Sequence, residues 1–219
     1  MKDPISIKKI LSKALVMILG LLTISLTIYI FGLPFYPEIK YYLEAKQENQ
    51  DINSQMVETP ASTTPTNSTS TVAPSTLPSV QPTTSERKGN YLIIPKIGVD
   101  IPIVDSADSR WALNRGAWRM PQTSTPDKGS NTAIAGHRFK YLPPSNLTFY
   151  LLDKLVPGDQ FHIIWEGKLY YYRVTENKIV PPTQVSVLDP TEKSIVTLIT
   201  CDPIFTQKNR LIVVGELID

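Results

Sequence analysis

The sequence predicts a mostly β domain of 131 residues, 89–219, at the carboxyl end of a chain that begins with a membrane helix. Three observations carry this prediction. Residues 14–33 contain no charged side chain, residues 59–85 consist largely of Thr, Ser and Pro, and residues 89–219 hold eight short runs rich in Val, Ile and Tyr. Such runs are typical of β-strands, and their spacing favours a mostly antiparallel barrel or sandwich.

The membrane helix is predicted at residues 14–33, after a basic tail at residues 1–13. A helix of about 20 residues rises about 30 Å, which matches the hydrocarbon thickness of a bilayer. A cleaved signal peptide is the alternative, but its apolar part is usually only about 7–15 residues long, and no small-residue cleavage site follows here. Because the lysines precede the helix, we expect a single-pass protein with a cytoplasmic amino terminus.

An extracellular stalk is predicted at residues 34–88. Within residues 59–85, 20 of 27 residues are Thr, Ser or Pro and none is charged. Such a segment buries too little apolar surface to offset the entropy lost on ordering the chain. We therefore expect a disordered stalk that carries the domain at residues 89–219 away from the membrane.

The expected strands of that domain are short apolar runs, and one helix is expected among them. The helix would follow Asn146 as its cap, with Leu147, Tyr150, Leu151 and Leu155 at helical spacing, and would end at Pro157-Gly158. The expected strands are residues 91–94, 99–104, 132–135, 161–165, 169–175, 178–180, 195–200 and 211–217.

Cys201 is the only cysteine of the chain, so an internal disulfide is excluded. It follows the strand-like run 195–200, and Pro203 comes two residues later, where a central strand cannot continue. We therefore expect the strand to end at Cys201. A buried structural thiol is the alternative, since cysteine is often buried, but an unused thiol outside the cell is a liability.

Two residues are candidate partners of this thiol. Arg210 opens the apolar run after Cys201, and an antiparallel hairpin would bring the two side chains together. His137 follows Gly136 at the end of the run 132–135, where the glycine allows the backbone to turn; an ordinary surface histidine is the alternative. The other histidine, His162, lies within an alternating strand pattern and is not expected to take part in chemistry.

The segments Thr197-Leu198-Ile199-Thr200-Cys201 and Gly136-His137-Arg138, together with Arg210, resemble the active site of the sortases. These are membrane-tethered cysteine transpeptidases of bacterial surfaces. Residues 92–99 and 152–159 are similar to the first strand and the Leu-x-x-Gly-Asp turn of that family. The resemblance covers essentially all of residues 91–217 and implies an eight-stranded sortase-type β-barrel with short helices.

By this resemblance, Cys201 is the nucleophile, His137 the acid and base, and Arg210 the group that stabilises substrate and oxyanion. The implied substrate is a secreted protein with a carboxyl-terminal Leu-Pro-x-Thr-Gly-type sorting signal. The implied acceptor is a cell-wall amine, such as that of a peptidoglycan precursor, which resolves a thioester. The connection 180–194 corresponds to the region that shapes the signal pocket in relatives, although an ordinary long loop is the alternative. The expected substrate-binding residues are Thr200, Val185, Val187 and Leu188.

Cys201-Asp202-Pro203 and residues 209–213 look closest to class D or class E sortases. We see neither the Asp-Pro-Trp/Phe lid motif nor the second membrane helix frequent in pilus-polymerising class C enzymes, which favours the anchoring of single proteins. The role of Asp202 is open, because its charge would either orient His137 or discourage thiolate formation.

No cofactor is expected. One cysteine and two separated histidines make no metal-ligand cluster. Calcium, which some relatives bind, would have Glu176, Asp189 and Glu192 as ligands, but three scattered acids are more often solvated surface groups.

The remaining composition limits other functions. A net charge of +2 does not favour nucleic-acid binding, and no nucleotide motif is present. Two other classes of function stay open. An extracellular cysteine endopeptidase would use the same thiol and imidazole but release the acyl group to water. A non-catalytic stalked surface interaction module would tolerate the loss of Cys201.

Overall fold

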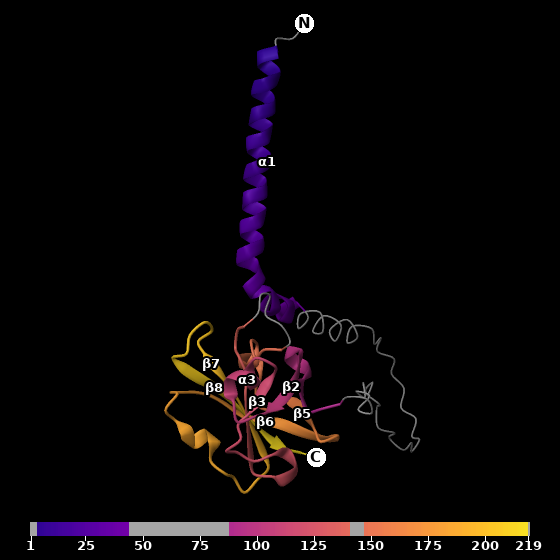
Figure 1. Cartoon of the computed structure of the whole chain (residues 1–219), viewed down its shortest axis with the longest axis vertical. Coiled ribbons are helices and arrows are strands. Elements are labelled where there is room, and N and C mark those ends of the chain that lie inside the picture. Colours follow the sequence, from indigo (N-terminus) through magenta and orange to yellow (C-terminus); the bar gives the residue numbers. More distant parts are fainter. Residues whose placement is uncertain (1–3, 44–87, 141–146, 219) are drawn as a thin grey trace, which may run out of the picture.

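The computed structural model describes residues 4–43, 88–140 and 147–218 of the chain. A long amino-terminal helix precedes a closed β-barrel, in which the strands follow the order β1-β2-β3-β4-β7-β8-β6-β5 (Figure 1). The prediction of an eight-stranded barrel with short helices is confirmed. The strands are β1 (Tyr91–Ile94), β2 (Val99–Asp105), β3 (Ala117–Arg119), β4 (Asn131–Ala135), β5 (Gln160–Trp165), β6 (Lys168–Val180), β7 (Ile195–Asp202) and β8 (Asn209–Leu217).

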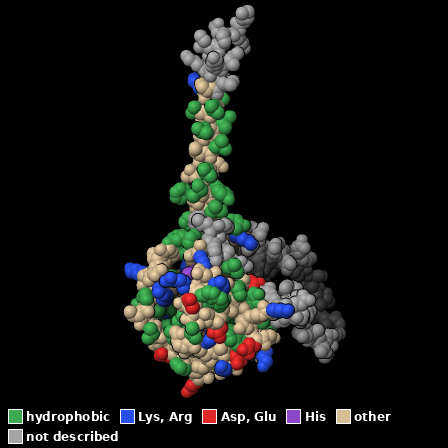
Figure 2. Space-filling model, viewed as in Figure 1, with side chains coloured by type: hydrophobic (Ala, Val, Ile, Leu, Met, Phe, Trp, Pro, Cys, Tyr) green, Lys and Arg blue, Asp and Glu red, His purple; other side chains and the backbone are tan. Residues whose placement is uncertain are grey.

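The amino-terminal helix, α1 (Pro4–Gly32), is long and apolar enough to cross a membrane over Ser12–Gly32. Figure 2 shows hydrophobic side chains along the exposed surface of this helix. Residues 4–13 continue the same helix beyond the stretch that the sequence predicted. The helix fits the expected membrane anchor, since its apolar side chains are not buried by the protein.

A short segment after α1 contacts the barrel domain. The 3-10 helix η1 (Leu33–Phe35) leads into a helical stretch at residues 36–43. Within it, Tyr41 packs against the barrel core, and Glu38 forms an ion pair of 3.1 Å with Lys154. The predicted Thr/Ser/Pro-rich stalk at residues 59–85 lies outside the described residues.

Two of the eight pairings that close the barrel are parallel. β2 pairs in parallel with β3, and β4 pairs in parallel with β7, whereas the other six pairings are antiparallel. The expectation of a mostly antiparallel sheet holds for those six. The β4–β7 pair places the carboxyl ends of two strands at the same edge of the barrel wall, which no hairpin would do.

Alternate residues of β7 and β8 fill the inside of the barrel. Val196 and Leu198 of β7, and Leu211 and Val213 of β8, belong to one buried core. The intervening positions, such as Ile199 and Ile212, therefore face the outside of the wall. Short connecting elements complete the domain: η2 (Pro95–Ile97), α3 (Ser109–Leu113), η3 (Pro126–Lys128), η4 (Leu152–Lys154) and η5 (Val185–Leu188).

The predicted helix after Asn146 is wrong. Residues 147–151 form turns, and only η4 is helical. Phe149, Tyr150, Leu151 and Leu152 are all buried in the core, and four consecutive residues point to all sides of an α-helix. Because the segment has no polar face, irregular turns bury its side chains better than a helix on the surface would.

The strand boundaries differ in two places. The predicted runs 169–175 and 178–180 form one strand, β6, with an irregularity in its pairing between Val174 and Glu176. The sequence prediction missed β3 and α3 because both are very short. β3 nevertheless bridges β2 and β4, so the barrel does not close without it.

The connection between β6 and β7 is fastened to the barrel by a buried asparagine. Asn131 of β4 donates hydrogen bonds from Nδ2 to the carbonyl oxygens of Val187 (3.0 Å) and Asp189 (3.1 Å). Its Oδ1 accepts a hydrogen bond from the Thr197 hydroxyl at 2.8 Å. Both side chains are at most 2% exposed, so these bonds hold η5 against the outer wall of β4 and β7.

Replacement of Asn131 by Ala is expected to release this connection. The variant loses both bonds to the connection, and the free energy of unfolding should fall by about 1–3 kcal/mol. Amide hydrogen exchange followed by mass spectrometry should then show faster exchange at residues 185–189. Thr197→Val is the matched control, because it removes the third bond of Asn131 but leaves the two bonds to the connection. Equal exchange in Asn131→Ala and wild type would contradict this role.

Candidate active site

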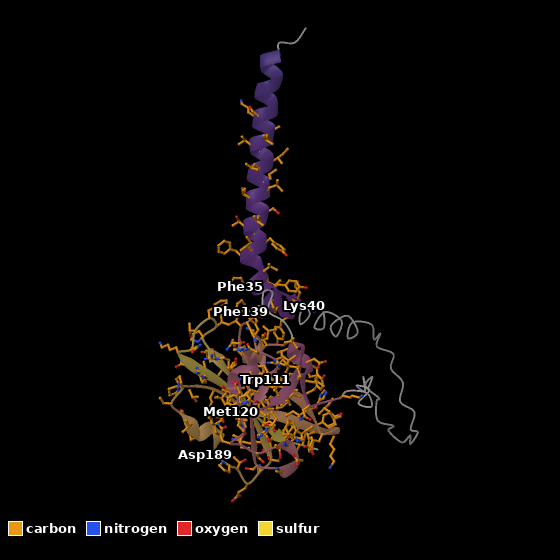
Figure 3. The ribbon with its side chains drawn as sticks, in the orientation of Figure 1. Phe35, Lys40, Trp111, Met120, Phe139 and Asp189 are labelled. Atoms are coloured by element: carbon orange, nitrogen blue, oxygen red, sulfur yellow. The ribbon has the colours of Figure 1, made fainter. Side chains whose placement is uncertain are left out.

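A cavity of about 360 Å³ lies against the outer face of the wall formed by β4, β7 and β8. The β6–β7 connection forms its opposite side, and Leu113, Trp118 and Met120 from α3 and the β3 region complete it. Figure 3 shows Met120 among the side chains of the barrel domain. All seven residues predicted for catalysis or substrate binding line this one cavity: Cys201, His137, Arg210, Thr200, Val185, Val187 and Leu188.

The register of three neighbouring strands brings the predicted catalytic residues together. Ala135 is level with Ile199 in the parallel β4–β7 pair, and the Gly136 N–H still bonds the Ile199 carbonyl, so His137 leaves β4 beside the end of β7 that carries Cys201. On the other side of β7, Cys201 and Arg210 are direct partners in the antiparallel pair with β8. Since adjacent strands lie about 4.8 Å apart, the thiol has the histidine on one flank and the arginine on the other.

Cys201 is partly exposed and lies within β7 rather than at its end. The sequence analysis expected the strand to stop at Cys201, but β7 continues to Asp202, which still pairs with Asn209 of β8. Pro203 then begins the loop, as its missing N–H requires. A sealed structural thiol is therefore contradicted, because Cys201 lines an open cavity.

Gly136 positions His137, but for another reason than the one inferred from sequence. Its backbone is not in the left-handed region, so a turn does not require glycine here. A β-carbon at this position would lie 2.8 Å from the ring of Phe149, which is fully buried. The glycine is needed because this ring packs directly on the backbone, and the Phe149 N–H also donates to the His137 carbonyl at 2.8 Å.

Two hydrogen bonds join this segment to β7. The Gly136 N–H donates to the Ile199 carbonyl at 3.0 Å, and the Thr200 hydroxyl donates to the Gly136 carbonyl at 2.9 Å. Thr200 is only 3% exposed. Its hydroxyl therefore ties the backbone beside His137 to the backbone beside Cys201, while the residue also borders the cavity.

Arg210 is oriented by the loop between β7 and β8. Its Nη1 donates to the carbonyl oxygens of Gln207 (3.1 Å) and Asn209 (2.9 Å). An arginine keeps its charge under all ordinary conditions and presents five N–H donors. These two bonds to Nη1 hold the cation at the mouth of the cavity that it shares with Cys201.

Asp202, whose role the sequence left open, forms an ion pair with Arg138. The distance from Arg138 Nη1 to Asp202 Oδ1 is 3.1 Å, and both side chains are largely buried. The carboxylate of Asp202 is thus paired with Arg138, for which the sequence predicted no separate role.

Burial lowers the pKa of His137 below its ordinary value of about 6.5, and the charge of Lys140 lowers that pKa further. The imidazole is therefore neutral at neutral pH and able to accept a proton. Lys140 is held near it by hydrogen bonds from Nζ to the Leu113 carbonyl (3.2 Å) and Asn114 Oδ1 (2.8 Å).

The other titratable candidates lie away from this cavity. His162 is buried on β5, on the far side of the barrel order, and does not line the cavity. Glu176 and Asp189 border a second cavity of about 190 Å³, and Glu176 is paired with Lys178 at 2.8 Å. The described residues contain no group of three or more His, Cys, Asp or Glu suited to a metal ion. The expectation that no cofactor is required stays a prediction.

The sequence analysis missed the side of the cavity formed by Leu113, Trp118 and Met120. Trp118 lies on the three-residue strand β3, which is too short to show a period. The one available signal was a tryptophan in the triplet Ala117-Trp118-Arg119, which lies between Gly116 and Pro121. Only the barrel closure shows that this triplet lies beside β4.

The closed barrel thus brings a cysteine, a histidine and an arginine to one cavity on the outer face of a β-wall. The sequence model of the "Sortase domain" matches residues 92–218, more than half of the chain. The chain therefore belongs to the sortase family, whose members are cysteine transpeptidases.

Known sortases resemble this chain in sequence and in structure. Sortase SrtE1 of Streptomyces coelicolor is 35% identical over 143 residues, which cover 58% of this chain and 40% of that protein. Sortase A of Listeria monocytogenes is 32% identical over 126 residues, which cover 58% of this chain and 54% of that protein. The solved structure "Sortase C1 of GBS Pilus Island 1" has a TM-score of 0.53 at 33% identity, covering 59% of this chain and 64% of that one.

The chain spans about half the length of the curated relatives it matches. The relatives carry class A, class C and class E names, so they show the family and do not separate its classes. Our assignment to class D or class E stays a prediction.

The contact between Gly136 and Phe149 is tested by Gly136→Ala. The added methyl group forces the ring to move, and overpacking of this kind should lower the free energy of unfolding by about 1–3 kcal/mol. Urea denaturation measures the loss. The double variant Gly136→Ala with Phe149→Leu relieves the clash, so its loss should be smaller than the sum of the two single losses. Strictly additive losses would show that the ring does not exclude a side chain here.

The cause of the low pKa of His137 is tested by Lys140→Met. Removing the lysine charge should raise the pKa of His137 toward its ordinary value, although burial still holds it lower. NMR titration of the imidazole protons measures this, and His137→Gln assigns the signal because the chain has only two histidines. Lys178→Met, which removes a cation distant from the cavity, is the control. An unchanged titration in Lys140→Met would refute the proposed influence.

The same pKa predicts how stability depends on pH. Below the ordinary pKa of about 6.5 the unfolded chain binds a proton at His137 that the folded chain does not bind. The free energy of unfolding should therefore decrease as the pH falls below that value. The decrease should be smaller in His137→Gln, as measured by urea denaturation at a series of pH values.

Proposed function

We propose that this protein is a sortase transpeptidase that cleaves a carboxyl-terminal Leu-Pro-x-Thr-Gly-type signal of secreted proteins and transfers the acyl group to a cell-wall amine. The observation that carries the proposal is the placement of Cys201 between His137 and Arg210 at a cavity closed by η5. Membership of the sortase family supports the reaction class. The signal and the acceptor are inferred from resemblance to that family.

The cavity suits an extended apolar segment with a nearby scissile bond. Val185, Val187 and Leu188 line one side, and Ile199 and Ile212 line the barrel wall. The leucine and proline of the signal would pack among these side chains, which gain by leaving water. The Thr carbonyl would then lie beside the thiol and the guanidinium.

Acylation begins when the sulfur of Cys201 attacks the Thr carbonyl carbon. The thiol proton passes to His137, which is neutral in the free protein because its pKa is lowered by burial and by Lys140. Negative charge develops on the carbonyl oxygen, and the fixed cation of Arg210 stabilises it. The bond to the Gly nitrogen then breaks, His137 returns the proton to that nitrogen, and a thioester remains.

Deacylation reverses these roles with a new amine. The amine attacks the thioester carbon, loses its proton to His137, and forms an amide. The sulfur leaves as a thiolate and regains the proton from His137, so no net proton is gained or lost by the enzyme. The peptidoglycan precursor is the proposed amine, and the substrate proteins are proposed to be anchored as single proteins.

The membrane topology is part of the proposal. The lysines before the apolar span at Ser12–Gly32 favour a cytoplasmic amino terminus. The barrel would then lie outside the cell, where secreted proteins and cell-wall precursors are present. A single-pass anchor keeps the enzyme at the surface from which its substrates emerge.

The reaction is tested with the full-length protein in detergent and a panel of Leu-Pro-x-Thr-Gly-type peptides. Mass spectrometry should show a covalent acyl adduct and, with added amine, a transpeptidation product. Cys201→Ala should form neither. Arg210→Ala should turn over about a hundredfold more slowly, because one charged donor to the oxyanion is lost. Arg173→Ala, which changes an arginine outside the cavity, is the matched control.

Two outcomes would contradict the proposal. Identical spectra for wild type and Cys201→Ala across the whole panel would exclude thiol catalysis and favour a surface interaction module. A hydrolysed product that is unchanged by any added amine would identify an endopeptidase instead.

A further inference from the structure

The structure contains a buried arginine beside the catalytic residues that the mechanism above does not use. Arg138 directly follows His137 and is only 7% exposed. All of its guanidinium nitrogens are engaged. Nε donates to the Tyr150 carbonyl (3.1 Å), Nη2 to Asp153 Oδ1 (2.8 Å), and Nη1 to Asp202 Oδ1 (3.1 Å) and to the Cys201 carbonyl (3.4 Å).

These contacts join the segment after β4 to the end of β7, two segments that the Thr200 hydroxyl also bridges. Arg138 belongs to the segment after β4, whereas Asp202 is the last residue of β7 and directly follows Cys201. The Asp153 and Tyr150 contacts anchor the guanidinium from the side of η4. Arg138 is therefore fixed by Tyr150 and Asp153, and it in turn donates a hydrogen bond to the backbone carbonyl of Cys201.

The charge of Asp202 gives this contact a second consequence. Asp202 is adjacent to Cys201 and its side chain is only 17% exposed, so its charge is weakly screened. The two side chains point to opposite faces of β7, and an uncompensated carboxylate on the adjacent residue opposes a second negative charge on the sulfur. Arg138 supplies the compensating positive charge at 3.1 Å.

We propose that Arg138 is a positioning residue that joins the end of β7 to the segment carrying His137 and neutralises Asp202, so that the Cys201 thiolate can form beside a neutral ion pair. Arg210, which Arg138 does not contact, is then left to act on the substrate. The inference rests on the proposed function in that Cys201 is taken to be the nucleophile.

Other charged groups near Cys201 also affect the ionisation of its thiol. His137 and Arg210 flank Cys201 on β4 and β8, and Lys140 follows His137. Asp153 and Lys154 of η4 pair with each other at 3.2 Å, and Lys208 lies in the loop between β7 and β8. None of these groups is replaced in the variants below, although Arg138→Gln also removes the ion pair of 2.8 Å between Arg138 and Asp153.

The test measures the ionisation of Cys201 directly, without a sorting peptide. Full-length protein in detergent is alkylated with iodoacetamide over a series of pH values, and the adduct is counted by mass spectrometry. Cys201 is the only cysteine, so the rate reports on that thiol alone. The midpoint of the rate against pH belongs to the coupled Cys201–His137 pair, and differences between variants are compared.

The proposal predicts shifts of opposite sign. Arg138→Gln leaves Asp202 uncompensated and should raise the midpoint by about one pH unit, which is about tenfold less thiolate at a fixed lower pH. Asp202→Asn removes the negative charge next to Cys201, leaves Arg138 paired only with Asp153, and should lower the midpoint. The double variant Arg138→Gln with Asp202→Asn should return close to wild type.

Arg119→Gln is the matched control. Arg119 is also 7% exposed and is paired with Asp105 at 2.5 Å, and β4 separates its strand β3 from β7. It should lose stability without a shift of the midpoint. If Arg138→Gln does not fold, Asp202→Asn decides the matter alone, because it keeps the anchored arginine.

An unchanged midpoint in Asp202→Asn, or a shift in Arg138→Gln that Asp202→Asn does not reverse, would overturn the inference. The result is separable from the proposed function. If the midpoints shift as expected but no peptide is transferred, the inference about Arg138 holds and the proposed transpeptidase function is excluded. Peptide transfer by the wild type, together with equal midpoints in all variants, would support the transpeptidase and overturn the inference about Arg138.

Discussion

The geometry of the site depends on one constraint, the position of β7 between a parallel neighbour and an antiparallel neighbour. The β4–β7 pairing brings His137 to the same cavity as Cys201, and the β7–β8 pairing makes Arg210 the direct partner of Cys201. A slip of one residue in either pairing would turn the thiol toward the buried core, because side chains alternate between the two faces of a strand. Since the barrel is closed, such a slip would also disrupt the packing of Val196 and Leu198. The packing of the core therefore also fixes the geometry of the site.

The charges around Cys201 fall into two groups with different surroundings. Arg138 and Asp202 form a largely buried pair behind the end of β7, whereas Arg210 lines the cavity and is oriented by loop carbonyls. The buried pair is fixed by geometry and presents little net charge to the thiol. The cation at the cavity stays available to an oxyanion, which fits a site that must generate a thiolate and then stabilise charge on its substrate. On the opposite side of the cavity, Asn131 fixes the β6–β7 connection through two hydrogen bonds.

Sequence reasoning succeeded where a local pattern carries the structure and failed where long-range packing does. Short β-branched runs located seven of the eight strands, although two runs proved to be the single strand β6. The predicted helix after Asn146 was wrong because an apolar segment without a polar face is buried as turns. The strand β3 was missed because Ala117–Arg119 is stabilised by pairing with β2 and β4 rather than by its own propensity. Gly136 was recognised, but the reason for it, the ring of Phe149, lies 13 residues away.

The sequence by itself determined the apolar helix long enough to cross a membrane, the β character of the domain, the lone thiol and the residues that resemble a sortase site. These are properties of composition, periodicity and short motifs, which are encoded locally. The tertiary structure decided that β4 and β7 run in parallel, that η5 covers the outer wall, and that Arg138 rather than His137 takes up the charge of Asp202. Such contacts join residues 56 to 64 positions apart, as Asn131 and Val187 or Arg138 and Asp202 are, and arise only when the closed barrel brings distant segments together.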